Sequence, residues 1–240
     1  MSAKQVELFT LSGLRVRAEA RWFPVAALVI VALALRYFPA SYPNLSASAY
    51  WAMSAAGAVA LFSSILLHEL SHALVARRYG VPSRGITLAM LGGRAEVERE
   101  LSTPGGDALM AVAGPCANLL TAGLSVALVK LGRGDWPVAV IGVLAFTATV
   151  NLLLTGVNAL PVYPLDGGRV VRALLWRGTG AMGRATRIAA HLGEGFAVLL
   201  AVGGVAAVLR GAHVIGAVGV LAGVYLLRHA SSTRREAARD

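Results

Sequence analysis

Long apolar runs alternate with short polar or basic segments along most of this chain. A helix needs about 20 residues, with a range of roughly 17–25, to cross the hydrocarbon layer of a bilayer. Six runs come close to or exceed that length: residues 22–38, 51–79, 107–131, 136–160, 188–209 and 212–227. The pattern therefore predicts an all-α polytopic membrane protein with six transmembrane helices, in one domain over residues 1–240.

The pattern changes between the second and third runs. Residues 86–90 and 94–98 have strand-like composition and flank Leu91-Gly92-Gly93, which predicts a small membrane-associated β-hairpin over residues 84–100. A hairpin of this size is marginal alone, so we expect it to lean on the helices. Its free edge could accept an extended peptide as a further strand. The alternative is a plain connecting loop at the membrane surface.

Composition agrees with a membrane location: 57% of the 240 residues are hydrophobic and 14% are charged, with a mean hydropathy of +0.67. These values exclude an ordinary water-soluble domain. The net charge of +10 does not indicate nucleic-acid binding, because the basic residues sit at the ends of apolar runs. The single cysteine, Cys116, excludes an intramolecular disulfide and a cysteine-based zinc site.

Basic residues gather in residues 1–21, 77–99, 169–187 and 228–240, which fall on alternate sides of the six spans. The positive-inside rule then predicts a cell-membrane protein with both termini in the cytoplasm. Residues 1–21 form a basic leader without the apolar core of a signal peptide, and residues 228–240 form a polar tail. Lys130, Arg133 and Arg210 are exceptions to the charge pattern.

The second run contains the stretch His68-Glu69-Leu70-Ser71-His72. Four helical residues advance about 6 Å and slightly more than one turn, so the two imidazoles can share one metal ion. Glu69 lies beside them, where a carboxylate could take a proton from a metal-bound water. The alternative is a chance match with packing histidines. Ionisable groups are costly at bilayer depth, which favours the functional interpretation.

A catalytic zinc site needs a third protein ligand, and Asp166 is the best candidate in the chain. It follows the fourth run, in a segment whose two prolines and two glycines break a regular helix. Broken backbone at membrane depth is tolerated where it lines a cavity or is buried in protein. The alternative is an ordinary turn, in which Asp before Gly is common. Since Arg77 follows His68 by about 14 Å of helix, we expect the site toward the cytoplasmic side.

Three motifs resemble those of the site-2 protease family of intramembrane zinc metalloproteases. They are His68-Glu-Leu-Ser-His72, Gly114-Pro-Cys-Ala-Asn118, and Asn158-Ala-Leu-Pro-Val-Tyr-Pro-Leu-Asp166-Gly-Gly-Arg169. The resemblance covers roughly residues 8–175. It implies one Zn²⁺ per chain bound by His68, His72 and Asp166, with Glu69 as the catalytic residue. It also implies that Asn158 stabilises the oxyanion or holds substrate.

The same resemblance implies a single-span transmembrane protein as substrate, cleaved in regulated intramembrane proteolysis. The substrate-binding residues would be Asn118 and, in the hairpin, Gly92, Gly93 and Arg94. Many relatives carry PDZ or CBS domains, but we expect neither in this chain. The last two apolar runs carry no family motif.

Several points stay open at this level. His191 and Glu194 can share a helix face, either as a polar wall or gate of a water path or as a paired interface feature, which we favour. Residues 169–176 could form a short interfacial helix. The rival functions are a non-catalytic metal-binding or transport protein and an inactive scaffold. The sequence gives no oligomeric state.

Overall fold

The computed structural model describes residues 5–89 and 92–236. Its chain divides into two compact units, one of Met1–Glu100 with Ala113–Gly156 and the other of Leu101–Val112 with Val157–Asp240. Helix α4 (Pro104–Leu131) begins in the second unit and continues into the first, and α5 (Val138–Asn158) ends just inside the second. The ends of the expected leader and tail, residues 1–4 and 237–240, lie outside the described residues.

Within the described residues, six helical segments are long and apolar enough to cross a membrane. They are Trp22–Ser41, Ala47–Arg78, Pro104–Leu131, Val138–Asn158, Met182–Leu209 and His213–Arg234. The prediction of six transmembrane helices in a mostly helical multi-pass protein is therefore confirmed. Helix α3 (Ala47–Arg78) starts before the expected residue 51, because the Ser46 hydroxyl accepts a hydrogen bond from Ala49 N and caps the helix.

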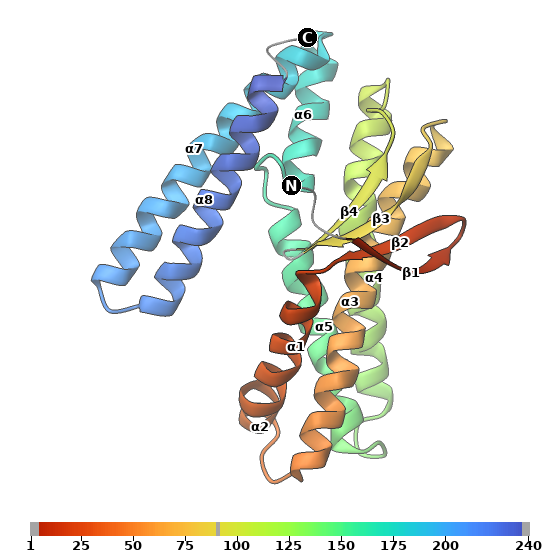
Figure 1. The fold of residues 1–240 in the computed structure, drawn as a ribbon, viewed down its shortest axis with the longest axis vertical. Coiled ribbons are helices and arrows are strands. Elements are labelled where there is room, and N and C mark those ends of the chain that lie inside the picture. Colours follow the sequence, from red (N-terminus) through yellow and green to blue (C-terminus); the bar gives the residue numbers. More distant parts are fainter. Residues whose placement is uncertain (1–4, 90–91, 237–240) are drawn as a thin grey trace. The chain divides into compact units, whose positions relative to one another are not determined.

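The helices of the first unit pack around an aromatic and aliphatic core. The first span comprises α1 (Trp22–Ala32), a π-helical turn η1 (Leu33–Tyr37) and α2 (Phe38–Ser41), and it lies beside α3 in Figure 1. Leu33, Phe38, Met53 and Phe146 form a buried cluster. Gly57 admits the Phe146 ring, since a Cβ at residue 57 would lie 3.2 Å from Phe146 Cδ1.

Eight serine and threonine hydroxyl groups in these helices are satisfied within their own helix. Each donates to the carbonyl oxygen four residues earlier, as the alternative in lipid would be an unpaired polar group. The residues are Ser54, Ser64, Ser71, Thr121, Ser125, Thr147, Thr149 and Thr155.

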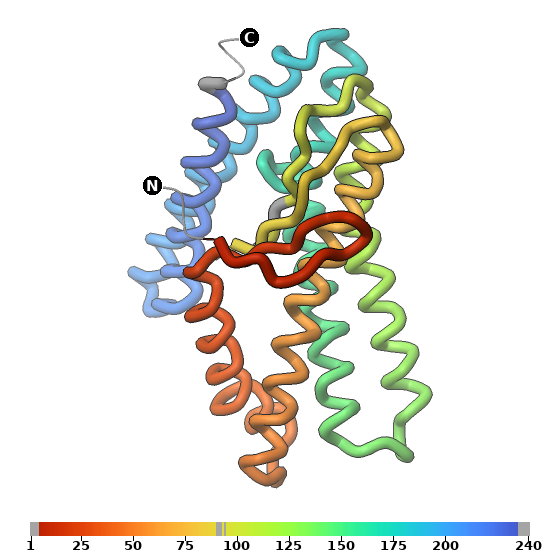
Figure 2. The backbone as a smooth tube through the Cα atoms, turned by 45° about the vertical axis from the view of Figure 1, so that its right-hand side comes forward, coloured from red at the N-terminus to blue at the C-terminus, as the bar shows by residue number. Residues whose placement is uncertain are grey.

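The first unit also holds a four-stranded sheet in the order β1-β2-β3-β4, visible as neighbouring strands in Figure 2. Its strands are β1 (Gln5–Leu11), β2 (Leu14–Glu19), β3 (Ser83–Ala89) and β4 (Gly92–Val97). The predicted hairpin is the antiparallel β3–β4 pair, although its Met90 and Leu91 lie outside the described residues. The sequence analysis did not predict β1 and β2, which belong to the leader segment. Strand β2 runs parallel to β3, a pairing that needs a long crossover connection, and the first two spans provide it.

The sheet has one face against α3 and one polar face. Leu14 and Ile86 are buried against Ala73 of α3. On the polar face, Glu96 accepts hydrogen bonds from Arg17 Nη1 at 3.0 Å and from Thr87 Oγ1 at 2.6 Å. At the exposed end of the sheet, the hydrogen bond from Arg84 to the Glu98 carboxylate raises the pKa of the Arg84 guanidinium. These cross-strand pairs fix the register that places β4.

The second unit contains α6 (Asp166–Thr179), α7 (Met182–Leu209) and α8 (His213–Glu236). Helices α7 and α8 form an antiparallel hairpin, seen side by side in Figures 1 and 2. Glycines let their backbones meet: a Cβ on Gly204 would lie 2.6 Å from Val220 N, and one on Gly223 would lie 2.7 Å from Ala197 O. Such small-residue contacts are typical of helix pairs in membranes.

His191 and Glu194 belong to this hairpin. His191 Nδ1 lies 3.3 Å from Glu194 Oε2. Glu194 Oε1 also accepts hydrogen bonds from Arg234 Nε at 2.9 Å and Ser231 Oγ at 3.0 Å, both on α8. These contacts confirm the favoured interpretation, a paired feature at a helix interface.

A buried ion pair joins the start of α4 to α6 within the second unit. Arg172 Nη2 lies 2.6 Å from Asp107 Oδ1 and Arg172 Nε lies 3.1 Å from Asp107 Oδ2, a bidentate pair. Both side chains are at most 1% exposed. The Arg172 guanidinium also lies over the Tyr163 ring, 5.7 Å from its centroid. These contacts therefore tie together three segments: the start of α4, the loop before α6, and α6 itself.

We expect Asp107→Asn to lower the free energy of unfolding by about 3–5 kcal/mol, since it leaves the Arg172 charge buried without its counter-ion. The measurement is unfolding in detergent by titration with a denaturing surfactant. The double variant Asp107→Leu/Arg172→Met should lose less than Asp107→Asn alone. Glu98→Gln, which breaks the exposed pair with Arg84, should change little. Equal losses in Asp107→Asn and Glu98→Gln would contradict this account.

Candidate metal centre

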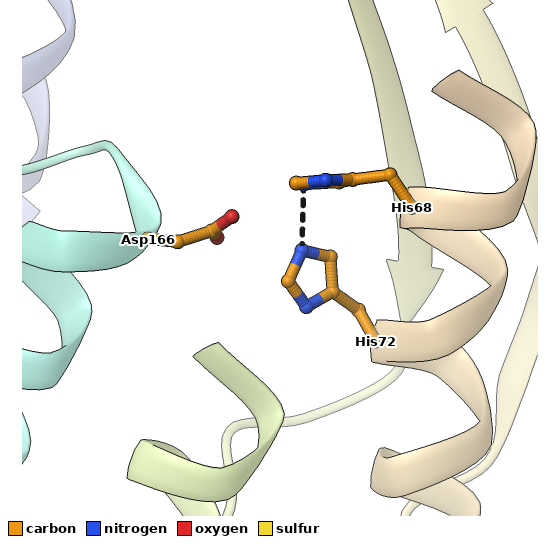
Figure 3. A group of neighbouring side chains, drawn as sticks. All are labelled: His68, His72 and Asp166. Carbon is orange, nitrogen blue, oxygen red and sulfur yellow. Dashed lines mark hydrogen bonds between the residues drawn. The ribbon is translucent and has the colours of Figure 1, made fainter. Parts of the chain in front are cut away.

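Helix α3 presents His68 and His72 on one face, as their spacing predicts. Their Nε2 atoms lie 3.0 Å apart, and the two rings are nearly perpendicular, at 83°. The side chains are buried, with 7% and 5% exposure. Figure 3 shows both rings projecting from α3 with the Nε2 contact dashed. Two imidazoles that bring the same nitrogen to one point are suited to share a metal ion.

Helix α4 passes directly over this imidazole pair at Gly114. A Cβ at residue 114 would lie 2.5 Å from His72 Nε2 and 2.6 Å from His68 Nε2. Any larger side chain would fill the space in front of the two nitrogens. The absent side chain therefore leaves a cradle at the place where an ion would bind, and the donor set fits a zinc ion.

Asn118, one helical turn after Gly114, contacts the outer side of His68. The side chain is 1% exposed, and its Nδ2 lies 3.1 Å from His68 Nδ1. The sequence analysis assigned this residue to substrate. In the structure its described contact is with a candidate metal ligand.

Glu69 faces the sheet. Its Oε2 accepts a hydrogen bond from Ala95 N of β4 at 2.9 Å. A Cβ at Gly93 would lie 2.5 Å from Glu69 Cγ, so the carboxylate side chain lies flat against the strand. Residue 69 is 100° around the helix from residue 68, which directs it away from the shared imidazole face.

The structure places the hairpin residues that were predicted to bind substrate in different surroundings. Gly92 begins β4, and Gly93 packs against Glu69. The side chain of Arg94 lies outside what the structure describes. Substrate contacts by these residues remain predictions.

The second unit carries Asp166 and Asn158. Asp166 is 7% exposed and opens α6, whereas the sequence analysis placed it in the broken segment before a helix at residues 169–176. An acidic residue is favoured in a first helical turn. Gly167 and Gly168 bring this turn against the backbone of Ala159, Leu160 and Tyr163. Asn158 is the last residue of α5 and is half-buried.

Sequence reasoning missed three contributors to these arrangements: the Gly114 cradle, the Ala95 N–H, and the Asp107–Arg172 pair. The four-residue spacing of Gly114 and Asn118 is a usable signal, since it places both on one helix face. Nothing in the sequence pattern signals which strand N–H meets Glu69, because that contact depends on packing between α3 and β4.

The model of peptidase family M50 matches residues 56–134 and 135–202, more than half of the chain. The chain belongs to peptidase family M50. This M50 chain is 41% identical over 78% of its length to Rip3 of Mycobacterium tuberculosis. It is 32% identical over 97% of its length to sll0528 of Synechocystis. Both relatives carry the words zinc metalloprotease in their names.

The M50 chain spans about half the length of these relatives, 46% of Rip3 and 60% of sll0528. Its fold matches the site-2 protease from Methanocaldococcus jannaschii, with a TM-score of 0.62, 23% sequence identity, and coverage of 96% of this chain and 95% of that one. The match to family M50 and the two zinc metalloprotease relatives confirm the predicted family resemblance, and the 23% identical structure shows the shared fold.

We expect Gly114→Ala to abolish zinc binding, since its methyl group would displace the two Nε2 atoms. Zinc per purified chain and affinity in chelator competition measure this. Gly123→Ala on the same helix is the matched control, because a Cβ there meets nothing within 4 Å. Helix content should be unchanged in both variants. Normal zinc affinity in Gly114→Ala would show that the ion does not lie in this cradle.

Proposed function

We propose that this M50 chain is a zinc-dependent intramembrane endopeptidase that cleaves the transmembrane segment of single-span membrane proteins in regulated proteolysis. One observation carries the proposal: two buried imidazoles share a point on a membrane-length helix, with a carboxylate at the next position held outside their shared face. A transport site would need the ligands but no such carboxylate. The names of the relatives support the same chemistry.

The proposed ligands of one zinc ion per chain are His68, His72 and Asp166. Each is buried and offers one donor atom, and Figure 3 draws the three side chains. Two imidazoles and a carboxylate, with one position left for water, are typical of catalytic zinc sites. When bound, zinc would supply a Lewis acid and a water of lowered pKa.

Glu69 is the proposed general base. Its carboxylate can take the proton of the attacking water and return it to the leaving amine. The hydrogen bond from Ala95 N and the close approach of Gly93 hold that carboxylate in one place. Asn158 is proposed to donate a hydrogen bond to the developing oxyanion.

The substrate must expose a peptide bond, although a transmembrane helix hides its carbonyls in its own hydrogen bonds. Strand β4 is an edge of the sheet. An unwound segment that pairs with this edge would recover its backbone hydrogen bonds. Because Gly93 and Ala95 of β4 contact Glu69, such a strand would run beside the proposed base.

For orientation, we propose that both termini and the active site lie toward the cytoplasm. Helix α3 ends in Arg77 and Arg78, and basic residues follow the positive-inside pattern. The lipid bilayer and a single-span protein are the proposed partners.

We expect Glu69→Gln to retain zinc and to cut cleavage of a model membrane substrate by about 10²–10⁴-fold, as removal of a general base does. Single-turnover cleavage in proteoliposomes and metal analysis measure the two properties. Glu7→Gln, in strand β1 at the opposite edge of the sheet from β4, is the control. Normal cleavage by Glu69→Gln would overturn the mechanism, and loss of zinc would make Glu69 a ligand.

Gly93→Ala separates positioning of the base from metal binding. Its methyl group would meet Glu69 Cγ, and displacement of a reacting group by about 1 Å can cost up to about 100-fold in rate. We expect a lower kcat with unchanged zinc content, measured as above. Gly105→Ala, where a Cβ meets nothing within 4 Å, should match the unaltered chain. An unchanged kcat in Gly93→Ala would exclude β4 as the support of Glu69.

A further inference from the structure

The amide of Asn118 is buried beside a proposed zinc ligand, in an orientation that leaves one of its atoms unsatisfied. Its Nδ2 lies 3.1 Å from His68 Nδ1. Within the described residues, Asn118 Oδ1 is buried and has no hydrogen-bond partner. A buried carbonyl oxygen without a partner costs free energy, so an orientation that gives this oxygen a donor would be more stable.

The hydrogen positions on the His68 ring explain why the Asn118 oxygen has no partner in this orientation. Its Nε2 faces the Nε2 of His72, which makes Nε2 the nitrogen available to a metal. A neutral imidazole that offers its Nε2 lone pair carries its hydrogen on Nδ1, so Nδ1 is then a donor. An amide Nδ2 is also a donor, and two donors facing each other do not bond.

Turning the Asn118 amide by 180° removes both problems. The orientation of an amide and the tautomer of a histidine are assigned from hydrogen bonding. After the turn, Oδ1 faces the Nδ1–H of His68 and accepts from it. One change therefore satisfies the unpaired oxygen and the imidazole hydrogen together.

We propose that Asn118 is a positioning residue, whose Oδ1 accepts a hydrogen bond from His68 Nδ1–H and thereby fixes the tautomer and ring orientation in which Nε2 binds the metal. This inference rests on the proposed zinc site. Metal-ligating histidines commonly donate their second ring N–H to such a partner, and loss of that partner weakens metal binding about 10–100-fold.

The same face of α4 thereby contacts the proposed metal ligands at two positions. Gly114 makes room in front of the two Nε2 atoms, and Asn118, one turn later, holds the back of the His68 ring. Both depend on one close approach of α4 to α3 within the first unit.

Asn151 offers a matched control. It is also a buried helical asparagine, 0% exposed, and its Oδ1 likewise has no hydrogen-bond partner among the described residues. Its Nδ2 donates to Ser64 Oγ and Thr147 O, each at 2.8 Å. Its described contacts include no histidine, so it shares the burial of Asn118 but not the proposed role.

The experiment compares the full-length variants Asn118→Leu, Asn118→Asp and Asn151→Leu in detergent. Zinc affinity by chelator competition is the readout, with the absorption spectrum of the cobalt-substituted protein as a report on ligand geometry. We expect Asn118→Leu to weaken zinc binding about 10–100-fold and to alter the cobalt spectrum. Asn118→Asp, which keeps an acceptor, should bind within a few-fold of the unaltered chain. Asn151→Leu should bind normally.

Normal zinc affinity in Asn118→Leu would overturn the proposal, as would equal weakening in Asn151→Leu or no rescue by Asp. If the leucine variant does not fold, Asn118→Ala removes the acceptor with less bulk and gives the same test. His68→Ala separates this inference from the proposed function. If His68→Ala still binds zinc tightly, the proposed metal site is refuted. If His68→Ala loses zinc binding while Asn118→Leu binds zinc with normal affinity, only the proposed role of Asn118 is refuted.

Discussion

Two imidazoles and a carboxylate on a single turn of an apolar helix impose the strongest constraint on this chain. Polar groups at membrane depth need partners from the protein, because lipid offers none. The local helix satisfies hydroxyls, as Ser64 and Ser71 show. His68 and Glu69 find partners on other elements, Asn118 of α4 and Ala95 of β4. The elements around α3 therefore have to supply groups that reach them.

Two elements of the first unit supply such groups from different directions. Helix α4 contributes a glycine and an amide on one face, and strand β4 contributes a backbone N–H. Each is a small or backbone group, which allows close approach without steric conflict. The sheet is then more than a connecting feature, because the register of β4 against β3 decides which N–H of β4 meets Glu69.

The helical spans and the histidine pair could be predicted from the sequence. The contacts that could not be predicted join residues that are distant along the chain. Period-four spacing places His68 and His72 together, and apolar length predicts the spans. The alternation of Leu14, Val16 and Ala18 with charged residues is a strand signal that a leader interpretation overlooked. Its parallel pairing with β3, across an entire helical hairpin, has no local signature. The same is true of the Asp107–Arg172 pair, whose partners are 65 residues apart.

The separation of roles that we propose for the motif would have a physical cause in these contacts. A carboxylate adjacent to two metal-binding imidazoles is itself a good zinc ligand, so the proposed mechanism requires a feature that keeps Glu69 from binding the ion. Helix geometry turns residue 69 by about 100° from residue 68, but a flexible side chain could turn back. The Ala95 N–H and the flat surface at Gly93 remove that freedom. Edge strand β4 thus provides a reason why, in the proposed mechanism, this carboxylate would act on a proton while its neighbours would hold the metal.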